Sequence, residues 1–244
     1  MKTIAVMQPT YLPWLGYFAL MSAVDEFVFL DDVQFARRSW QQRNRIKVSA
    51  GELMLTVPVF KKDKRDQLIK EVEIDWSSRF EQKHVRSIEK AYGRAQYWST
   101  HGAPLCEAIA TRTTHLAEYN ITIISLLQGM LEIDTPSVRS SNLPLDGKRE
   151  DRLIAICKAR GADAYVSPPG SRAYLEGSDA FERAGIALHY FEYNHPIYPQ
   201  LHNDFISHLS VTDLILNCGD DSLAMLERGV QLKDADSQRG GPTS

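Results

Sequence analysis

The sequence predicts an α/β fold: a Rossmann-like, mostly parallel sheet with a β-hairpin insertion and a helical segment. Three observations favour this class. The first 30 or so residues read as strand, loop, helix and strand, an opening typical of a parallel sheet with a right-handed crossover. Strands and helices alternate again from about residue 137 onward. The 244 residues, 43% of them hydrophobic, are enough to bury a large core without disulfides.

The opening unit supplies the first two strands. Residues 3–7 form a short apolar run, and residues 25–31 form a second one. Between them we expect a helix that starts near Pro13, because proline lacks the N–H that would be left unpaired in a first helical turn. Apolar side chains then recur at helical spacing up to the second strand.

A β-hairpin insertion is expected at about residues 50–76. Residues 54–60 and 68–75 have strand-like composition and are expected to pair with each other. The lysine-rich segment between them, residues 61–67, suits an exposed, solvated turn, and a phosphate clamp is the alternative.

A helical segment is expected at about residues 76–132. Ser78 and Glu81 match a capping box ahead of the first helix, and Gly93 can end that helix. The two further helices expected in this segment are residues 103–118 and 120–132.

The remaining expected elements are a strand at 137–143, a helix at 149–161 ended by glycine, strands at 164–168 and 186–193, and helices between 210 and 228. Residues 1–230 are therefore expected to form a single α/β domain. The polar, glycine-rich tail at 231–244 is expected to be disordered.

Composition argues against several functional classes. A net charge of −3 gives no electrostatic case for nucleic-acid binding. Three cysteines without CxxC spacing favour neither a disulfide framework nor structural zinc. No P-loop, GxGxxG, HExxH or EF-hand pattern occurs, so no metal and no cofactor is assigned with certainty. No apolar run of about 18 residues could span a membrane, and we expect a cytoplasmic protein.

Unusual composition marks the candidate site. Proline, aromatic, amide and basic residues gather in four stretches, at 8–18, 31–47, 167–175 and 192–205. Three of these stretches follow a predicted strand, and open parallel sheets bind ligands beyond the carboxyl ends of their strands. We therefore expect the loop before the first helix, the arginine-rich segment and the corner at 193–200 to share one cavity.

The arginine-rich segment holds five cations, which are Arg37, Arg38, Arg43, Arg45 and Lys47. Guanidinium groups form bidentate hydrogen bonds with phosphate or carboxylate, so the segment could bind an anion; a solvated basic loop is the other interpretation. Asp31 and Asp32 follow the second strand and could bind a ribose hydroxyl or orient an arginine. Structural ion pairing explains them equally well.

His195 is the candidate general base. It lies in a loop beside Tyr193 and Tyr198, and histidine titrates near neutral pH. Hydrogen bonding that shapes the loop is its alternative role. Cys218 and His208 are not expected to form a catalytic pair, because a helix between them would hold them roughly 15 Å apart.

The run Trp14-Leu15-Gly16-Tyr17 resembles the helix start of nucleotidylyltransferases and class I synthetases. Those proteins place a His-x-Gly-His signature after a strand and a proline-containing loop. Both histidine positions are aromatic in this sequence. If the fold is shared, the resemblance implies that the phosphate chemistry is altered or absent.

Several stretches together resemble the WbqC-like protein family: "QPTYLPWLGYF", "DEFVFLDDVQF", "RNRIK", "LTVPV", "YPQ" and "FISHLSVTDLILNCG". They run from Gln8 to Gly219, which is nearly the whole expected domain. Members of the family are associated with bacterial O-antigen and other surface-polysaccharide gene clusters. The resemblance therefore implies a role in making or decorating an activated sugar, and it assigns no catalytic residue.

The leading hypothesis is a transferase of glycan biosynthesis that moves an acyl or aminoacyl group onto a nucleotide-linked sugar or amino sugar, with His195 as the base. A coenzyme A or carrier-protein thioester would be the donor, and an acyl carrier protein a possible partner. Such a reaction needs alignment, a base and oxyanion donors. The residues expected to bind substrate are Gln8, Tyr11, Trp14, Tyr17, Asp31, Gln34, Arg43, Asn44, Lys47, Ser167, Ser171, Tyr193 and Gln200.

Two alternatives remain open. One is a non-catalytic nucleotide-sugar-binding protein on a degenerate nucleotidylyltransferase-like fold. The other is that the aromatic and proline residues are all structural. Exposed aromatic surface at 92–98 could serve a homodimer.

Overall fold

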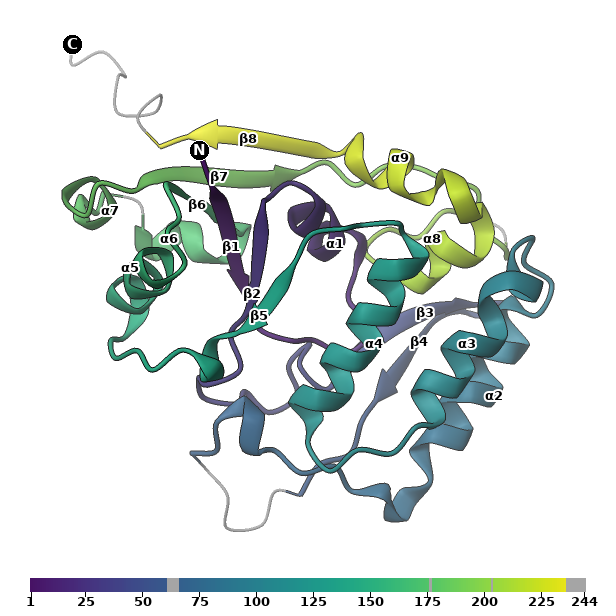
Figure 1. The fold of residues 1–244 in the computed structure, drawn as a ribbon. Coiled ribbons are helices and arrows are strands. Elements are labelled where there is room, and N and C mark those ends of the chain that lie inside the picture. The colour runs from purple at the N-terminus through teal and green to yellow at the C-terminus, as the bar shows by residue number, and fades with distance from the viewer. Residues whose placement is uncertain (61–65, 176, 203, 236–244) are drawn as a thin grey trace.

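The computed structural model describes residues 1–60, 66–175, 177–202 and 204–235. Its centre is a six-stranded sheet in the order β5-β2-β1-β6-β7-β8, and a second sheet pairs β3 with β4 (Figure 1). The strands are β1 (Thr3–Met7), β2 (Glu26–Phe29), β3 (Arg43–Val48), β4 (Gly51–Thr56), β5 (Ser137–Arg139), β6 (Ala164–Ser167), β7 (Ala187–Tyr193) and β8 (Val230–Asp234). The helices are α1 (Leu15–Ser22), α2 (Phe80–Tyr92), α3 (Trp98–Ala110), α4 (Leu116–Met130), α5 (Arg149–Ala159), α6 (Arg172–Leu175), α7 (Ala180–Arg183), α8 (Val211–Cys218) and α9 (Ser222–Glu227).

The six-stranded sheet is mostly parallel, as predicted. β1 pairs in parallel with β2 and with β6, and the pairs β2–β5 and β6–β7 are also parallel. Only β8 runs antiparallel to its described neighbour, β7. After β1 the chain first adds β2 and β5 on one side and then β6 and β7 on the other. The order therefore reverses between β1 and β6, which is the point where open α/β sheets bind ligands.

Both faces of this sheet are covered over its central strands, which explains why β1, β2 and β6 are mostly apolar and almost wholly buried. Ile4 and Val6 of β1 pack into a smaller core with α5 and α7. Ala5, on the opposite face, belongs to the larger core that includes α1 and α8. Figure 1 shows α5, α6 and α7 on one side of the sheet and α1 and α8 on the other.

The hairpin forms, but with other strands than those predicted. β3 and β4 pair from Arg43 opposite Thr56 to Val48 opposite Gly51, so the last five residues of the stretch at 31–47, which was predicted to be a loop, are strand. Charged residues at every second position of β3 concealed its alternation. Gly51 has a φ of 114°, a conformation that suits glycine at the tight turn.

Residues 68–75 do not form a continuous strand, and their predicted pairing with residues 54–60 is reduced to one antiparallel bridge between Val59 and Ile74. They contain a 3-10 turn, η1 (Ile69–Glu71), followed by isolated bridges. Their apolar side chains are buried with the three-residue spacing of such a turn, as at Ile69 and Val72. The predicted exposed turn at 61–67 lies largely outside the described residues, which exclude 61–65.

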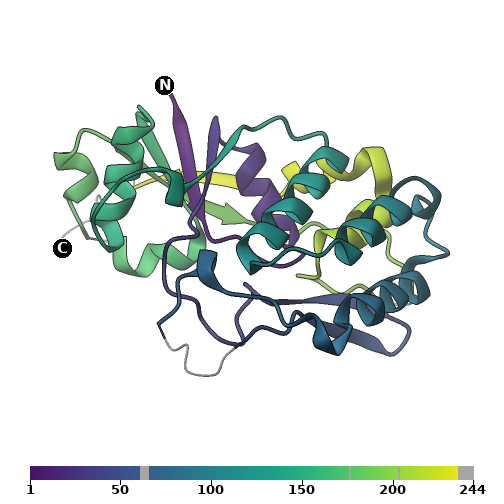
Figure 2. The same ribbon diagram turned by 60° about the horizontal axis from the view of Figure 1, so that its bottom comes forward.

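The helical segment packs α2, α3 and α4 side by side (Figure 2). The predicted capping box is wrong: α2 is preceded by Arg79 in the left-handed region, and the helix start has no side-chain cap. Glu81 instead pairs with Arg112 at 2.7 Å. Gly93 follows the last residue of α2, as predicted.

The boundaries of the next two helices also differ from the prediction. α3 begins at Trp98 and includes Pro104, and α4 begins at Leu116. The predicted helix could not continue to residue 118, because residues 111–115 are extended against the η1 region. There the N–H of Ile74 donates to the carbonyl of Thr114, and Leu116 donates to Val72.

Two further expectations are corrected. Residues 231–234, assigned to a disordered tail, belong to β8, while residues 236–244 lie outside the described chain. The expected aromatic surface at 92–98 is smaller than predicted: Tyr92 is fully buried, whereas Tyr97 and Trp98 are partly exposed, with their rings over Gly219 and Gly102.

None of the helices in the described chain combines the length and the apolar composition needed to cross a membrane.

Candidate functional site

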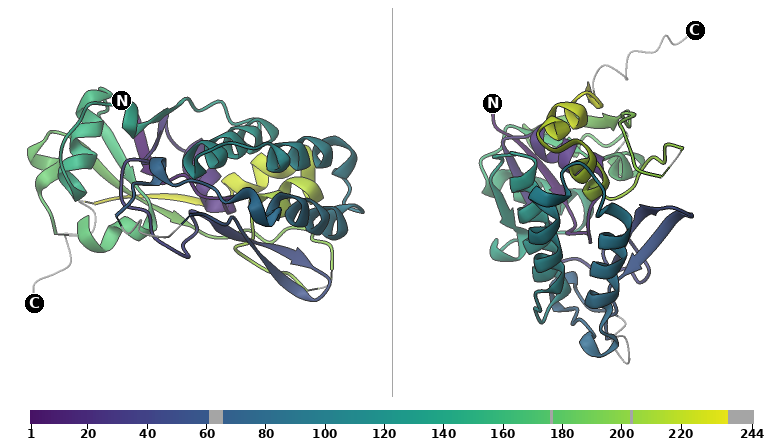
Figure 3. Two further views of the ribbon diagram at one scale, coloured as in Figure 1. Left: turned by 90° about the horizontal axis from the view of Figure 1, so that it is seen from below. Right: turned by 90° about the vertical axis from the view of Figure 1, so that its right-hand side faces the viewer.

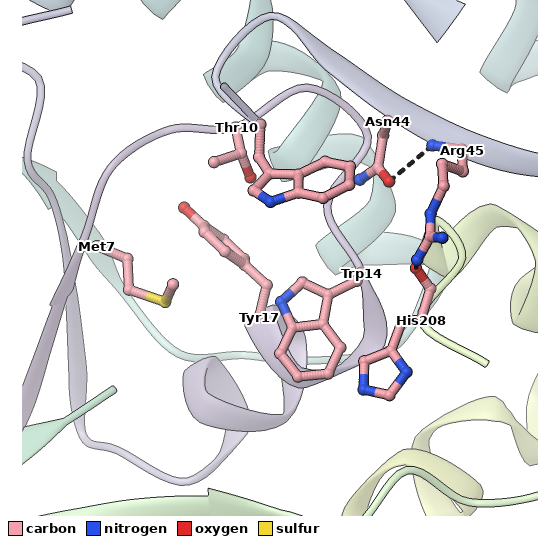
Figure 4. Close-up of a pocket in the computed structure, with 8 residues that line it drawn as sticks. Met7, Thr10, Trp14, Tyr17, Asn44, Arg45 and His208 are labelled. Carbon is pink, nitrogen blue, oxygen red and sulfur yellow. Dashed lines mark hydrogen bonds between the residues drawn. The ribbon is translucent and has the colours of Figure 1, made fainter. Parts of the chain in front are cut away.

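A cavity of about 300 Å³ opens beside the end of β1 (Figure 4). It is lined by Met7, Thr10, Trp14, Tyr17, Trp40, Asn44, Arg45 and His208. These residues come from the end of β1, the loop after it, the start of α1, the β3 region and a loop near residue 208. Three are large aromatic side chains, and the others place an amide, a guanidinium, a hydroxyl and an imidazole around them. The cavity lies beyond the carboxyl end of β1, which is one of the two strands that flank the switch point of the sheet.

Buried amides hold the loop of residues 8–14 in place. The side-chain amide of Asn44 donates to the carbonyls of Leu12, at 2.6 Å, and Tyr11, at 3.3 Å. Asn120 of α4 donates to the carbonyl of Pro9 at 3.1 Å. Leu12 is fully buried with a φ of 45°, a strained conformation for a leucine. These contacts add to the backbone hydrogen bonds of the loop, in which Tyr11 donates to the carbonyl of Trp40 and Val211 donates to the carbonyl of Pro13.

Trp14 forms one wall of the cavity. Its indole lies across Gly16, where a Cβ atom would come within 2.3 Å of the ring. It stacks on His208, with ring centroids 5.3 Å apart and planes 19° apart, and meets Tyr193 edge-on at 5.5 Å. The glycine two residues after Trp14 is therefore what allows the indole to lie flat at the helix start.

The two tyrosines of the first loop have different positions. Tyr17 lines the cavity, and its hydroxyl donates to the carbonyl of Gln8 at 3.3 Å. Tyr11 is buried in the core, where its hydroxyl is 2.8 Å from Nδ1 of His84 and its ring stacks on Tyr119. Gln8 does not line the cavity, and its side chain accepts a hydrogen bond from Gln41 at 2.7 Å.

Arg45 connects the hairpin to the rim of the cavity. Its Nη1 donates to both carboxylate oxygens of Glu52, at 3.0 and 2.8 Å, and its Nη2 donates to the carbonyl of His208 at 3.2 Å. The guanidinium lies 5.8 Å from the ring centroid of Trp40. Trp40 is 50% exposed, so its ring is available at the mouth.

His208 is the imidazole at the cavity, and the sequence analysis did not select it. Its backbone has a φ of 59°. Its Nδ1 lies 2.8 Å from Oγ of Ser207, and none of the hydrogen bonds among the described residues engages its Nε2. The tautomer in which Nδ1–H donates to Ser207 leaves the Nε2 lone pair able to accept a proton.

His195 lies behind His208 instead of lining the cavity. Its Nδ1–H donates to the carbonyl of Pro196 at 2.9 Å, and its Nε2 accepts from the backbone N–H of His208 at 3.0 Å. Burial lowers the pKa of the His195 ring below its usual value. Both ring nitrogens of His195 are therefore engaged, and its neutral ring holds the backbone of His208 in position. This arrangement corresponds to the alternative role of His195, hydrogen bonding that shapes the loop.

The loop that carries both histidines lies over the hairpin (Figures 2 and 3), and we call residues 194–202 and 204–208 the overlying loop. Lys47 of β3 is buried, and its ammonium donates to Oε1 of Gln200 at 3.1 Å and to the carbonyl of Asp204 at 2.6 Å. Gln200 also exchanges hydrogen bonds with the backbone of Ile206. Lys47 and Gln200 therefore attach this loop to β3 and do not line the cavity.

The two aspartates after β2 are structural. Asp31 is buried and pairs with Arg139 at 2.6 Å, and its carboxylate also accepts from Ser141. Asp32 pairs with Arg152. The sequence left open whether Asp31 and Asp32 bind a ligand or form structural ion pairs. These contacts correspond to ion pairing.

The remaining sequence candidates lie outside the cavity lining. Gln34 donates to Asp66 at 3.2 Å on the surface, and Ser167 is buried at the end of β6. Ser171 lies in the short turn η4 (Pro169–Ser171). Tyr193 backs Trp14, and its hydroxyl donates to the carbonyl of Leu226. Arg43 shares its strand face with Arg45 and is half-buried.

The expected shared cavity thus exists with one change. The first loop and the arginine-rich segment both line it, at Trp14, Tyr17, Asn44 and Arg45. The corner at 193–200 supports it from behind through Tyr193 and His195, and the loop reaches the cavity at His208. One signal could have indicated His208: it lies in the stretch "FISHLSVTD", two residues before the cap of a helix.

The cysteines are not activated nucleophiles. Burial raises the pKa of Cys106 to about 11, that of Cys157 to about 12 and that of Cys218 to about 11. None of the three lines the cavity. Within the described ranges, no group of three or more histidine, cysteine or acidic side chains is arranged to hold a metal ion.

Comparison with known proteins gives one family and one relative. The model described as the WbqC-like protein family matches residues 8–225. An uncharacterized protein of Mycobacterium tuberculosis (strain ATCC 25618 / H37Rv), Rv1507c, is 34% identical over 225 residues, covering 90% of this chain and 95% of that protein. No solved structure matches the chain.

Proposed function

The chain belongs to the WbqC-like protein family, and from that premise we propose that it is a transferase that modifies a sugar for a bacterial surface polysaccharide such as O-antigen. The acceptor is a nucleotide-linked sugar or amino sugar, and the transferred group is an acyl or aminoacyl group from a thioester of coenzyme A or a carrier protein.

The observation that carries the proposal is the aromatic cavity beyond the carboxyl end of β1. Trp14, Tyr17 and Trp40 present ring surfaces to one space of about 300 Å³, a size suited to a single sugar or base. Aromatic faces pack well against both kinds of ring. Polar groups lie at the same cavity, which is the usual composition of a small-molecule site.

The chemistry assigned to the cavity is simple. Nε2 of His208 accepts the proton of the attacking amine or hydroxyl as the new bond to the acyl carbon forms and the bond from that carbon to sulfur breaks. The proton then passes to the departing thiolate, so no net proton is gained or lost. The hydroxyl of Thr10, which also lines the cavity, is the donor for the developing oxyanion.

The resemblance of the first 30 residues to nucleotidylyltransferases is part of the same proposal. The two aromatic residues that occupy the histidine positions of that class, Trp14 and Tyr17, both line the cavity. Tryptophan and tyrosine in place of the two histidines favour stacking on a ligand over chemistry at a phosphate. We therefore infer a related fold whose nucleotide site has been converted to hold an acceptor without cleaving it.

One observation favours the alternative of a non-catalytic binding protein. The ring of His208 contacts a serine hydroxyl, and no hydrogen bond within the described chain joins it to a carboxylate. Catalytic histidines are commonly oriented by an acidic group. A protein that only binds a nucleotide-linked sugar would need no such group.

A thermal-shift panel of UDP-, GDP- and dTDP-sugars, coenzyme A thioesters and carrier-protein thioesters tests the proposal. We expect a nucleotide-linked sugar to raise the melting temperature, and a thioester to be consumed when both substrates are present. Trp40→Ala should abolish the shift. Phe60→Ala is the matched control, since Phe60 is 49% exposed and lies outside the cavity lining.

The role of His208 separates the two functions. His208→Asn should bind the nucleotide-linked sugar normally and lose transfer, whereas His101→Asn on α3 should retain both. Ligand binding without thioester consumption by the unaltered protein would identify the non-catalytic alternative. Full transfer activity in His208→Asn would remove the proposed base.

A further inference from the structure

The row of cations on β3 has one member without an acceptor. Arg43, Arg45 and Lys47 alternate along the strand and share one of its faces, with neighbouring members about 7 Å apart. Lys47 donates to Gln200, and Arg45 donates to Glu52. The guanidinium of Arg43 has no hydrogen-bond or ion-pair partner among the described residues.

This lack of a partner is unusual because of where the donor lies. The Nε–H of Arg43 is buried and finds no acceptor in the described part of the chain, and the same is true of the Nε–H of Arg45. A buried N–H without an acceptor is costly, and in native proteins such groups usually have a partner, including bound waters or ions. Two such donors on neighbouring positions of one strand face therefore indicate an acceptor group that binds between or beside them.

The local charge indicates what that acceptor is. Residues 33–51 contain four arginines and one lysine and no acidic residue, in a chain whose net charge is −3. Arg38, in this segment, is exposed and likewise unpaired within the described residues. Guanidinium donors that lack an acceptor, in a segment without acidic residues, suit the oxygens of a phosphate.

The two buried Nε–H donors lie next to the aromatic cavity along β3. Arg45 lines the cavity and lies against Trp40 at its mouth, and Arg43 is two residues away on the same strand face. A ligand whose ring occupies the aromatic cavity could thus extend along β3 and reach both buried N–H groups.

We propose that Arg43 and Arg45 form a phosphate subsite that extends the aromatic cavity along β3, and that it binds the phosphate groups of a substrate. This inference rests on the proposed function for the ring that occupies the cavity. The phosphates come from the diphosphate of a nucleotide-linked acceptor or from the phosphates of a coenzyme A-type donor. Both sources present the same oxygens to the same guanidinium groups.

Isothermal titration calorimetry of the whole protein tests the subsite. The four probes are inorganic pyrophosphate, uridine, UDP and coenzyme A. Arg43→Gln should weaken the binding of at least one phosphate-bearing probe by tenfold or more, which corresponds to the loss of one charge-assisted contact. The affinity for uridine should not change. Arg94→Gln, which removes the same charge from the exposed loop before α3, is the control and should leave all four affinities unaltered.

The probes also distinguish the two sources. Weaker UDP binding with unchanged coenzyme A binding assigns the subsite to the acceptor, and the reverse result assigns it to the donor. Arg43→Lys keeps the charge but lacks the Nε–H, so it should lose most of the same affinity. It also provides the test if Arg43→Gln does not fold.

The outcomes separate failure of the subsite from failure of the proposed function. If uridine or UDP binds the cavity and both Arg43 variants retain full affinity for every phosphate probe, the subsite is wrong and the ring-binding function stands. If pyrophosphate binds in an Arg43-dependent way while no ring-containing probe depends on Trp40, the subsite stands and the proposed function is wrong.

Discussion

The indole of Trp14 covers Gly16 so closely that a Cβ atom at residue 16 would lie 2.3 Å from the ring. We predict that Gly16→Ala displaces the indole from its stack on His208 and opens the wall of the cavity. Overpacking of this kind typically costs about 1–3 kcal/mol of unfolding free energy. Urea denaturation measures the loss of stability, and tryptophan fluorescence reports the movement of the ring.

Gly129 provides a control for the same substitution. It lies in α4, and among the described residues no atom outside its own stretch of helix lies within 4 Å of the added Cβ, so Gly129→Ala should stabilise the protein by about 0.5–1 kcal/mol. If Gly16→Ala were as stable as the unaltered protein and bound ligand normally, the wall of the cavity would not depend on this contact.

Asn44 is predicted to be essential for the shape of the first loop. Its amide donates to the carbonyls of Tyr11 and Leu12 in a buried setting. Asn44→Ala leaves both carbonyls without this donor, which should cost about 1–3 kcal/mol. Asn142→Ala, at an exposed position, should change the free energy of unfolding by less than about 0.5 kcal/mol. Equal effects of the two variants in urea denaturation would contradict this role of Asn44.

Strands whose residues are mostly apolar and buried could be predicted from the sequence. β1, β2 and β6 are buried runs, β7 has a buried centre, and their place in the sheet followed from the alternation with helices. β3 was missed because Arg43, Arg45 and Lys47 occupy one of its faces, and the burial of an ammonium such as that of Lys47 depends on a loop about 155 residues later. β8 was missed because an exposed edge strand needs no apolar pattern.

The position of the cavity could be predicted from the sequence more readily than the full set of side chains that line it. Ligand binding beyond the carboxyl end of a parallel strand is a property of the topology, so Trp14 and Tyr17 could be selected from the sequence. The choice between His195 and His208 depends on which ring nitrogens are engaged, and that is set by backbone groups in a folded loop. Sequence composition favours His195, because it has more aromatic neighbours along the chain. In the structure His195 accepts a hydrogen bond from the backbone of His208 and so holds His208 in place.

His84 is predicted to make stability depend on pH. Burial lowers its pKa from 6.5 to about 4. Between these pH values the unfolded chain binds a proton that the folded protein does not, so the free energy of unfolding decreases as the pH falls from about 6.5 to 4. The full effect has an upper bound of about 3 kcal/mol.

Urea denaturation at several pH values between 4 and 8 checks this prediction. His84→Gln, which cannot titrate, should show a smaller decrease between pH 6.5 and 4 than the unaltered protein. His101→Asn should retain the full decrease, because it leaves the buried imidazole in place. An unchanged pH profile in His84→Gln would assign the acid sensitivity to other groups.

Lys47 is predicted to determine whether the overlying loop stays attached to β3. Its buried ammonium donates to Gln200 and to the carbonyl of Asp204, and its charge interacts with the carboxylate of Asp213. Burial raises the pKa of Asp213, and the charge of Lys47 opposes that rise. Lys47→Met removes the cation and leaves the acid buried, a change that typically costs about 3–5 kcal/mol.

Hydrogen exchange localises the effect of this change. Lys47→Met should increase exchange in residues 204–208 more than in β1 or β6, because the loop loses its attachment while the sheet keeps its pairing. Adding Asp213→Asn should recover part of the lost stability, since the double variant no longer buries an uncompensated charge. Lys90→Met, on the exposed face of α2, should have neither effect. If the two lysine variants exchanged alike, the overlying loop would be held by its other contacts, and His208 would keep its place at the cavity without Lys47.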